Sequence, residues 1–178
     1  MHDVFFTMLQ LQNTTISGGG TPLLVDISLS FSGNDGRKIA LLGHNGSGKS
    51  SLLQVLEGIH DPLTGSRVCS REQLGVVPQE PLLPKDLLVG EYLISKLTEE
   101  WEEYKIPMAL EEVGLTEDIT LKEGSQLSGG ESMRVWIAGE LLKEPTIFLL
   151  DEPTNHLDQE GRAWLGEFIK NFKGSAVI

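Results

Sequence analysis

The feature that most constrains this chain is the glycine-rich octapeptide Gly43-His44-Asn45-Gly46-Ser47-Gly48-Lys49-Ser50. The apolar run 39–42 precedes it and predicts a buried strand, and the segment 51–56 that follows has the character of a helix. Glycine permits backbone angles closed to other residues, so successive N–H groups of such a loop can turn inward around phosphate groups. The sequence therefore predicts a phosphate-binding loop that opens a helix.

The residues at the end of this loop carry the charge and the metal chemistry. Lys49 supplies a positive charge for terminal phosphates, and the Ser50 hydroxyl is placed to bind Mg²⁺. The free N–H groups of the helix N-terminus add a partial positive charge. A plain Gly/Ser turn that caps a helix would explain the glycines but not the Lys-Ser pair. The residues expected to bind nucleotide here are Asn45, Gly46, Ser47, Gly48, Lys49, Ser50 and Ser51.

Composition limits the class of protein. The 178 residues suffice for one well-buried core. The single cysteine, Cys69, excludes an internal disulfide and favours a reducing, cytoplasmic location. No segment has the length and apolar character of a signal peptide or a membrane span, so we expect no membrane insertion. The net charge of −12 argues against a general nucleic-acid binder, so contacts with RNA would come from regions outside this chain.

The pattern along the chain predicts an α/β fold. Segments 4–12 and 23–31 are expected to form an antiparallel layer, joined by a loop at 17–22. Three further strands are expected at 74–77, at 146–150 and from 176 onward. Helices are predicted at 128–143, where Ser128 and Glu131 have the spacing of a capping box, and at about 159–171.

Between these elements, residues 80–126 have helical periodicity and follow a proline-rich segment. Val89, Tyr92, Leu93 and Leu97 are expected on one buried face, and the acidic run 99–103 on a solvated one rather than in an interaction patch. We therefore expect one domain, 1–178, with an α/β core at 1–79 and 127–178 and a helical subdomain at 80–126.

Two acidic residues follow the predicted strand 146–150, at the strand end where open α/β sheets place their ligands. Asp151 is suited to hold Mg²⁺, and Glu152 to polarise a water molecule that attacks a γ-phosphate. The alternative is a pair of acids that begins a turn before Pro153. Gln79, after another predicted strand, can coordinate Mg²⁺ and bind a water molecule, although an ordinary surface glutamine is the commoner explanation.

The segment Leu127-Ser128-Gly129-Gly130-Glu131, with the phosphate loop before it and residues 149–158 after it, resembles the ABC-type ATPase domain over almost the whole chain. The resemblance implies ATP and Mg²⁺ as cofactors. It also implies a second ATPase domain as partner, paired head to tail, so that Ser128, Gly129 and Gly130 contact the γ-phosphate bound to the partner. Asp158 matches the family's D-loop and is also suited to cap the helix that begins near 159.

The segment 151–158 is most similar to the F subfamily of ABC proteins; it reads Asp151-Glu152-Pro153-Thr154-Asn155-His156-Leu157-Asp158. Members of that subfamily lack membrane spans, carry two ATPase domains in one chain and act mostly on ribosomes. The resemblance thus implies ATP hydrolysis that drives domain closure in translation. The alternatives are the ATPase subunit of an ABC transporter and a nucleotide-binding module without hydrolysis. His156 is expected in a turn or interface, and His44 at a variable loop position.

Two departures from the family pattern concern the adenine and the end of the chain. Gly18 stands where the family usually has an aromatic residue that stacks on adenine, which predicts poor discrimination between ATP and GTP. The family's switch histidine follows the strand that residues 176–178 begin. We therefore expect the chain to be a fragment of a longer protein and to hydrolyse ATP poorly by itself. Segment 80–126 holds no long inserted helical arm.

Overall fold

The computed structural model describes residues 8–33, 35–69, 74–155 and 157–178. Its contacts divide the chain into two compact units. The first comprises the described residues up to Val76 together with Thr146–Asp151 and Phe172–Ile178, and the second comprises Val77–Pro145 and Glu152–Asn171. No helix in the described ranges has the length and apolar character needed to cross a membrane.

The first unit begins with an antiparallel sheet of three strands in the order β2-β1-β4. Its strands are β1 (Met8–Gly18), β2 (Thr21–Ser32) and β4 (Thr64–Val68). The predicted antiparallel layer is confirmed, whereas the predicted loop 17–22 is too long: the turn is Gly19-Gly20 alone, both with positive φ. Two left-handed residues match the twist of a hairpin, so pairing continues to Gly18 and Thr21. Residues 4–7 of the first predicted strand lie outside the described residues.

The second sheet of this unit has the order β3-β7-β6-β5. Its strands are β3 (Lys38–Ile39), β7 (Ser175–Val177), β6 (Ile147–Leu150) and β5 (Leu74–Val77), with β7 parallel to β3 and to β6. The strands predicted near 74–77, 146–150 and 176–178 are confirmed. The predicted buried strand 39–42 is confirmed only in part. Strand β3 ends at Ile39, although the Leu41 N–H still donates to the Ile178 carbonyl oxygen at 2.6 Å; Ile39 and Leu41 are half-buried against the core, and Leu42 is 93% exposed. β3 is an edge strand, so a chain leaving it for the phosphate loop has few neighbours to cover its side chains.

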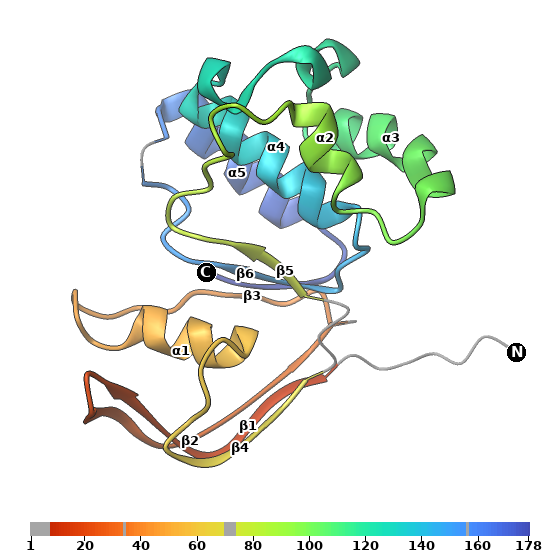
Figure 1. Cartoon of the computed structure of the whole chain (residues 1–178). Helices are drawn as coiled ribbons and strands as arrows, with labels where there is room; N and C mark the ends of the chain where they lie inside the picture. Colours follow the sequence, from red (N-terminus) through yellow and green to blue (C-terminus); the bar gives the residue numbers. More distant parts are fainter. Residues whose placement is uncertain (1–7, 34, 70–73, 156) are drawn as a thin grey trace, which may run out of the picture. The chain divides into compact units, whose positions relative to one another are not determined.

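Helix α1 (Lys49–Glu57) lies between the two sheets of the first unit, as Figure 1 shows. Its buried residues Leu52, Leu53, Val55 and Leu56 join a cluster with Leu9, Leu11 and Ile16 of β1 and with Ile147 and Leu149 of β6. At the other end of α1, the Arg67 guanidinium donates to the carbonyl oxygens of Leu56 (2.8 Å) and Glu57 (3.0 Å). The core thus fixes the helix that the phosphate loop opens.

The second unit is helical (Figure 1). It contains α2 (Val89–Ile94), η2 (Glu100–Tyr104), α3 (Lys105–Glu112), η3 (Glu117–Leu121), η4 (Gly124–Gln126), α4 (Gly129–Leu141) and α5 (Gln159–Asn171), the η elements being 3-10 helices. The predicted helices at 128–143 and 159–171 are confirmed within one or two residues. Val89, Tyr92 and Leu93 are buried as predicted, and Leu97 is half-buried. Glu99 and Glu103 of the acidic run are exposed, as expected of a solvated face.

Candidate functional site

The phosphate loop has the backbone conformation that its glycines were expected to provide. Gly46 and Gly48 have φ of +79° and +95°, and Gly48 is the N-cap of α1. A Cβ atom on Gly48 would lie 3.3 Å from Leu23 Cβ and from Leu24 Cγ, so the loop is seated on the β1–β2 hairpin. Residues 43–47 are exposed. The loop is therefore open to solvent on one side and backed by packed side chains on the other.

Lys49 and Ser50 are held by different partners. Lys49 Nζ donates to the carbonyl oxygens of Gly43 (2.9 Å) and His44 (3.2 Å), so the ammonium group lies back across the loop. Ser50 Oγ donates to Asp151 Oδ1 at 3.2 Å, although the two residues are 101 positions apart. A hydroxyl oxygen and a carboxylate oxygen at this separation are ligands that suit Mg²⁺. Among the described residues, no group of three or more His, Cys, Asp or Glu side chains is arranged to hold a metal ion. Ser50 Oγ and Asp151 Oδ1 are our candidate ligands in the first unit.

The position expected to lack an adenine-stacking residue is filled by a neighbour that sequence reasoning missed. Leu23 Cδ1 lies 2.5 Å from where a Cβ atom on Gly18 would stand, and the Leu23 side chain also backs Gly48. Leu23 is 39% exposed. An aliphatic surface thus lies beside the phosphate loop, and only the pairing of the hairpin could have revealed it.

Glu152, in the second unit, has a strained backbone and an anchored carboxylate. Its φ is +44°, in the left-handed region that disfavours residues with a Cβ atom. Asn155 Nδ2 donates to Glu152 Oε2 at 2.8 Å, and the Asn155 N–H donates to the Glu152 carbonyl oxygen at 3.0 Å. Because this tight turn directly follows Asp151, it sets the direction in which the Glu152 side chain leaves the backbone.

Gln79 lies in the same unit as Glu152. It lines a cavity of about 280 Å³ together with Asn155, Leu157 and Gly129. Asn155, whose amide donates to Glu152, therefore lines the same cavity as Gln79. The other lining residues are Glu80, Pro81, Leu82, Ser132 and Met133. The structure therefore gathers Gln79, Gly129 and the Glu152 turn in the second unit, and Lys49, Ser50 and Asp151 in the first.

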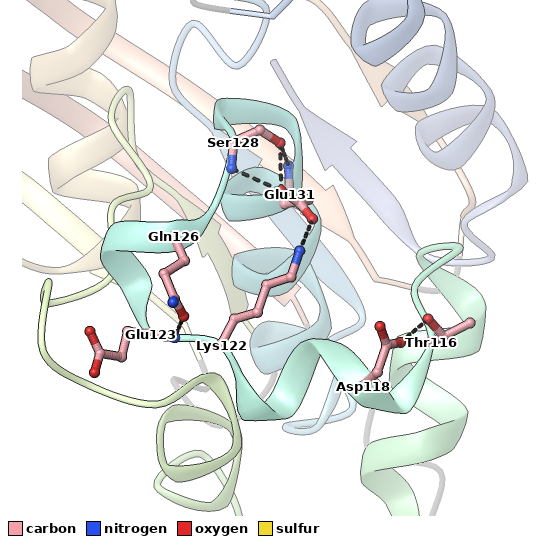
Figure 2. Close-up of polar contacts among 7 residues, drawn as sticks. All are labelled: Thr116, Asp118, Lys122, Glu123, Gln126, Ser128 and Glu131. Carbon is pink, nitrogen blue, oxygen red and sulfur yellow. Dashed lines mark hydrogen bonds and ion pairs between the residues drawn. The ribbon is translucent and has the colours of Figure 1, made fainter.

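The glycine pair Gly129-Gly130 opens helix α4, and Ser128 is its N-cap. The predicted capping box is confirmed (Figure 2): the Glu131 N–H donates to Ser128 Oγ at 3.2 Å, and the Ser128 N–H donates to Glu131 Oε2 at 2.9 Å. The Ser128 hydroxyl also donates to Glu131 Oε2, at 2.8 Å. The first turn of α4 is therefore locked by its own serine and glutamate.

Sequence reasoning missed Lys122, whose Nζ donates to Glu131 Oε1 at 2.7 Å (Figure 2). This bond to Lys122, followed by those from Ser128, lowers the pKa of Glu131 to about 2. Lys122 precedes Glu131 by nine residues across a segment whose regular structure before α4 is the short 3-10 helix η4, so no continuous helical or strand periodicity connects them. The only sequence signal is a lysine shortly before the glycine pair.

The segment that carries Lys122 is itself fixed. The Val89 N–H donates to the Lys122 carbonyl oxygen (2.9 Å), and the Gly124 N–H donates to that of Leu87 (3.0 Å). In Figure 2, Gln126 reaches back to Glu123, whose N–H donates to Gln126 Oε1 at 2.7 Å. Lys122 therefore approaches the first turn of α4 from an ordered backbone.

Asp158 caps the next helix. Its Oδ1 accepts a hydrogen bond from the Gly161 N–H at 2.8 Å, which confirms the predicted N-cap. Asp158, Ser128, Gly130 and Arg134 also line a second cavity, of about 270 Å³, within the second unit. The first turns of α4 and α5 thus open onto one polar hollow. His156 lies outside the described residues.

A glycine-rich loop with this sequence between a strand and a helix, with an Asp-Glu pair after another strand of the same sheet, is typical of a P-loop nucleotide-binding domain. The family model described as ABC transporter matches residues 27–155. The chain therefore belongs to this family, as a domain of its ATPases. The resemblance and the α/β fold predicted from the sequence are confirmed. Proteins of this family use ATP with Mg²⁺.

Relatives of two kinds match. The energy-dependent translational throttle protein EttA of Escherichia coli K12 is 35% identical over 195 residues, which cover 87% of this chain and 35% of EttA. The energy-coupling factor transporter ATP-binding protein EcfA2 of Acetivibrio thermocellus is 36% identical, over 85% of this chain and 61% of EcfA2. The chain thus spans about a third of the length of EttA.

Among solved structures, cbiO1 from Clostridium perfringens, part of the ABC transporter complex cbiONQ, superposes with a TM-score of 0.77 at 29% identity. The match covers 97% of this chain and 78% of that one. Similarity therefore extends to both translational and transporter ATPases, and it does not separate the two roles.

Proposed function

We propose that this domain binds MgATP at the loop 43–50, and that bound ATP drives head-to-tail closure with a second ABC ATPase domain and is then hydrolysed. The observation that carries the proposal is the approach of Ser50 Oγ to Asp151 Oδ1, 3.2 Å apart, at the start of the helix that the phosphate loop opens. Oxygen ligands for Mg²⁺ and inward-turning amides for phosphate then lie in one place.

Each residue of the site has a role in this proposal. Asn45, Gly46, Ser47, Gly48 and Ser51 surround the phosphates, Lys49 balances their charge, and Ser50, Asp151 and Gln79 hold Mg²⁺. When bound, Mg²⁺ neutralises charge on the terminal phosphates. Glu152 accepts the proton of the attacking water, with Gln79 helping to orient that water. The Asn155 amide restrains the Glu152 carboxylate and so fixes the direction from which the base acts.

Closure with a second domain is supported by the first turn of α4. Ser128, Gly129 and Gly130 form a helix N-terminus whose N–H groups suit an anion, and in the proposal that anion is the γ-phosphate bound to the partner domain. Lys49 and Ser50 belong to the first unit and Ser128 to the second, so nucleotide binding and closure can be disabled separately.

We favour an F-type, cytoplasmic role on the ribosome for the whole protein. The segment 151–158 and the similarity to EttA support this, and the acidic charge of −12 assigns RNA contacts to regions outside this chain. The second candidate is the ATPase subunit of a transporter, which the similarity to EcfA2 and cbiO1 favours. In the first case the protein carrying Glu152→Gln should co-sediment with ribosomes in ATP; in the second it should co-purify with membrane-spanning subunits.

The test of the biochemical proposal compares ATP turnover and dimer formation for the parent chain and Glu152→Gln. We expect Glu152→Gln to bind ATP as the parent does, to lose turnover at least about a hundredfold and to accumulate as an ATP-dependent dimer. Unchanged turnover would remove Glu152 from the role of base. ATP binding without turnover in the parent would identify a nucleotide-binding module that does not hydrolyse.

A further inference from the structure

The first turn of α4 contains an apparent electrostatic conflict. The N-terminus of this helix is suited to an anion, yet Glu131, its third residue, places a carboxylate there. This carboxylate is ionised at neutral pH, and its hydrogen bonds lower its pKa further, to about 2. Two like charges at one helix end repel each other, so an uncompensated Glu131 would oppose an approaching γ-phosphate.

Both oxygens of this carboxylate are engaged. Oε2 accepts hydrogen bonds from the Ser128 N–H and hydroxyl, and Oε1 accepts from Lys122 Nζ at 2.7 Å (Figure 2). Lys122 is a full positive charge in contact with the full negative charge of Glu131. The pair as a whole is neutral, and the dipole of α4 remains available to a further anion.

A second cation close to this turn is committed elsewhere. Arg134, one turn along α4, directs Nη1 toward the carbonyl oxygens of Val113 and Gly114 (3.5 Å each), and its guanidinium lies 4.7 Å from the centre of the Trp164 ring. The Lys122 backbone is in turn fixed by the Val89 N–H. The placement of Lys122 is thus built into the fold.

We propose that Lys122 is a positioning residue of the trans nucleotide site: it neutralises Glu131 and holds the Ser128–Gly130 turn ready for the γ-phosphate bound to the partner domain. This inference rests on the proposed head-to-tail closure. It assigns Lys122 no contact with nucleotide. Its effect passes through Glu131, to which its Nζ donates, so Lys122 should become dispensable once the charge of Glu131 is removed.

The test measures the ATP concentration needed for half-maximal dimer formation, by analytical ultracentrifugation of the chain carrying Glu152→Gln. Lys122→Met should raise that concentration about five- to tenfold, because Glu131 then repels the incoming phosphate. Lys122→Arg should behave as the parent. The decisive variant is Lys122→Met combined with Glu131→Gln, which removes both charges and should restore closure.

Two controls accompany these variants. Lys170→Met breaks an exposed ion pair with Glu167 on α5 and should leave dimer formation unchanged. Binding of a fluorescent ATP analogue to the monomer reports the loop 43–50 of the first unit and should be the same for every variant. Lys122 is 39% exposed at its side chain, so its replacement is compatible with folding, and monomer binding verifies this directly.

The outcomes separate the inference from the function on which it rests. If Lys122→Met closes like the parent, or if the double variant is impaired as much as the single one, the proposed role of Lys122 is overturned. Ser128→Arg tests head-to-tail closure itself, since a bulky side chain there should block it. Dimer formation unaffected by Ser128→Arg would refute closure through this turn, whatever Lys122→Met does.

Discussion

The strained turn at Glu152 leads to a prediction in which the variants differ in stability although they are equally inactive. A residue with a Cβ atom in the left-handed region costs about 1–2 kcal/mol, and Glu152 has φ of +44°. Glu152→Gly relieves this strain but adds about 0.4–1 kcal/mol of conformational entropy to the unfolded chain. Glu152→Ala retains the strain, and both variants lose the hydrogen bond from Asn155.

The glycine variant should therefore unfold with a free energy about 0.5–1 kcal/mol higher than the alanine variant, equivalent to about 1–4 °C in Tm. Glu152→Gln keeps an oxygen for Asn155 and should stay within about 0.5 kcal/mol of the parent. All three variants should lose ATP turnover about a hundredfold or more if Glu152 is the base. Glu152→Gly would then be more stable than Glu152→Ala, and the two variants would be equally inactive.

Thermal unfolding, monitored by circular dichroism, measures the order of stability among the variants, and phosphate release measures their ATP turnover. Glu160 provides a matched control, because it is exposed in the first turn of α5 with ordinary helical geometry. There the order should reverse, with Glu160→Gly less stable than Glu160→Ala by up to about 1 kcal/mol. If Glu152→Ala is as stable as Glu152→Gly while the variants of Glu160 show the predicted order, the backbone at 152 is not strained and the prediction is refuted.

Four further predictions concern single contacts. Ser50→Ala should leave the affinity for ATP in the absence of Mg²⁺ unchanged. It should reduce, by about tenfold, the increase in ATP affinity that Mg²⁺ produces, measured by titration with and without EDTA. Asp158→Ala removes the cap on the Gly161 N–H and should lower stability by about 1 kcal/mol in urea unfolding, whereas Asp158→Asn should retain most of it. Because the folded pKa of Glu131, about 2, is depressed, its stabilising contribution is complete above its ordinary value and is lost as pH falls from there toward 2; the Tm advantage over Glu131→Gln should shrink over that window. With Gly18 in place of an aromatic residue, ATP and GTP should bind with affinities within about tenfold of each other in paired titrations, and a strong ATP preference would contradict this.

Local signals were sufficient for several parts of the candidate site. The glycines of the loop 43–50, the pairing of Ser128 with Glu131 and the cap at Asp158 each involve residues within a few positions of one another. Interactions of this range depend on backbone geometry that residue type itself favours. The sequence therefore placed the starts of α1, α4 and α5 within two residues, together with the family to which the chain belongs.

Local signals in the sequence could not predict how far residues 39–42, before the loop, are buried. An apolar run predicts burial only if other elements cover it, and residues 39–42 lie at the end of an edge strand, where Ile39 and Leu41 are half-buried and Leu42 is exposed. The side chain beside Gly18 was likewise set by the register of the hairpin, which places Leu23 there. Both depend on neighbours that are absent from the local pattern.

The sequence by itself determined the local chemistry of this protein: a phosphate loop, an acidic pair after a strand and a capped glycine turn. Tertiary structure decided which of these groups meet. It brought Ser50 to 3.2 Å from Asp151 across 101 positions, gave Glu152 its left-handed backbone and set Lys122 against Glu131. The physical reason is that strand order and irregular segments fix distances between remote residues, and neither has a periodicity that a sequence displays.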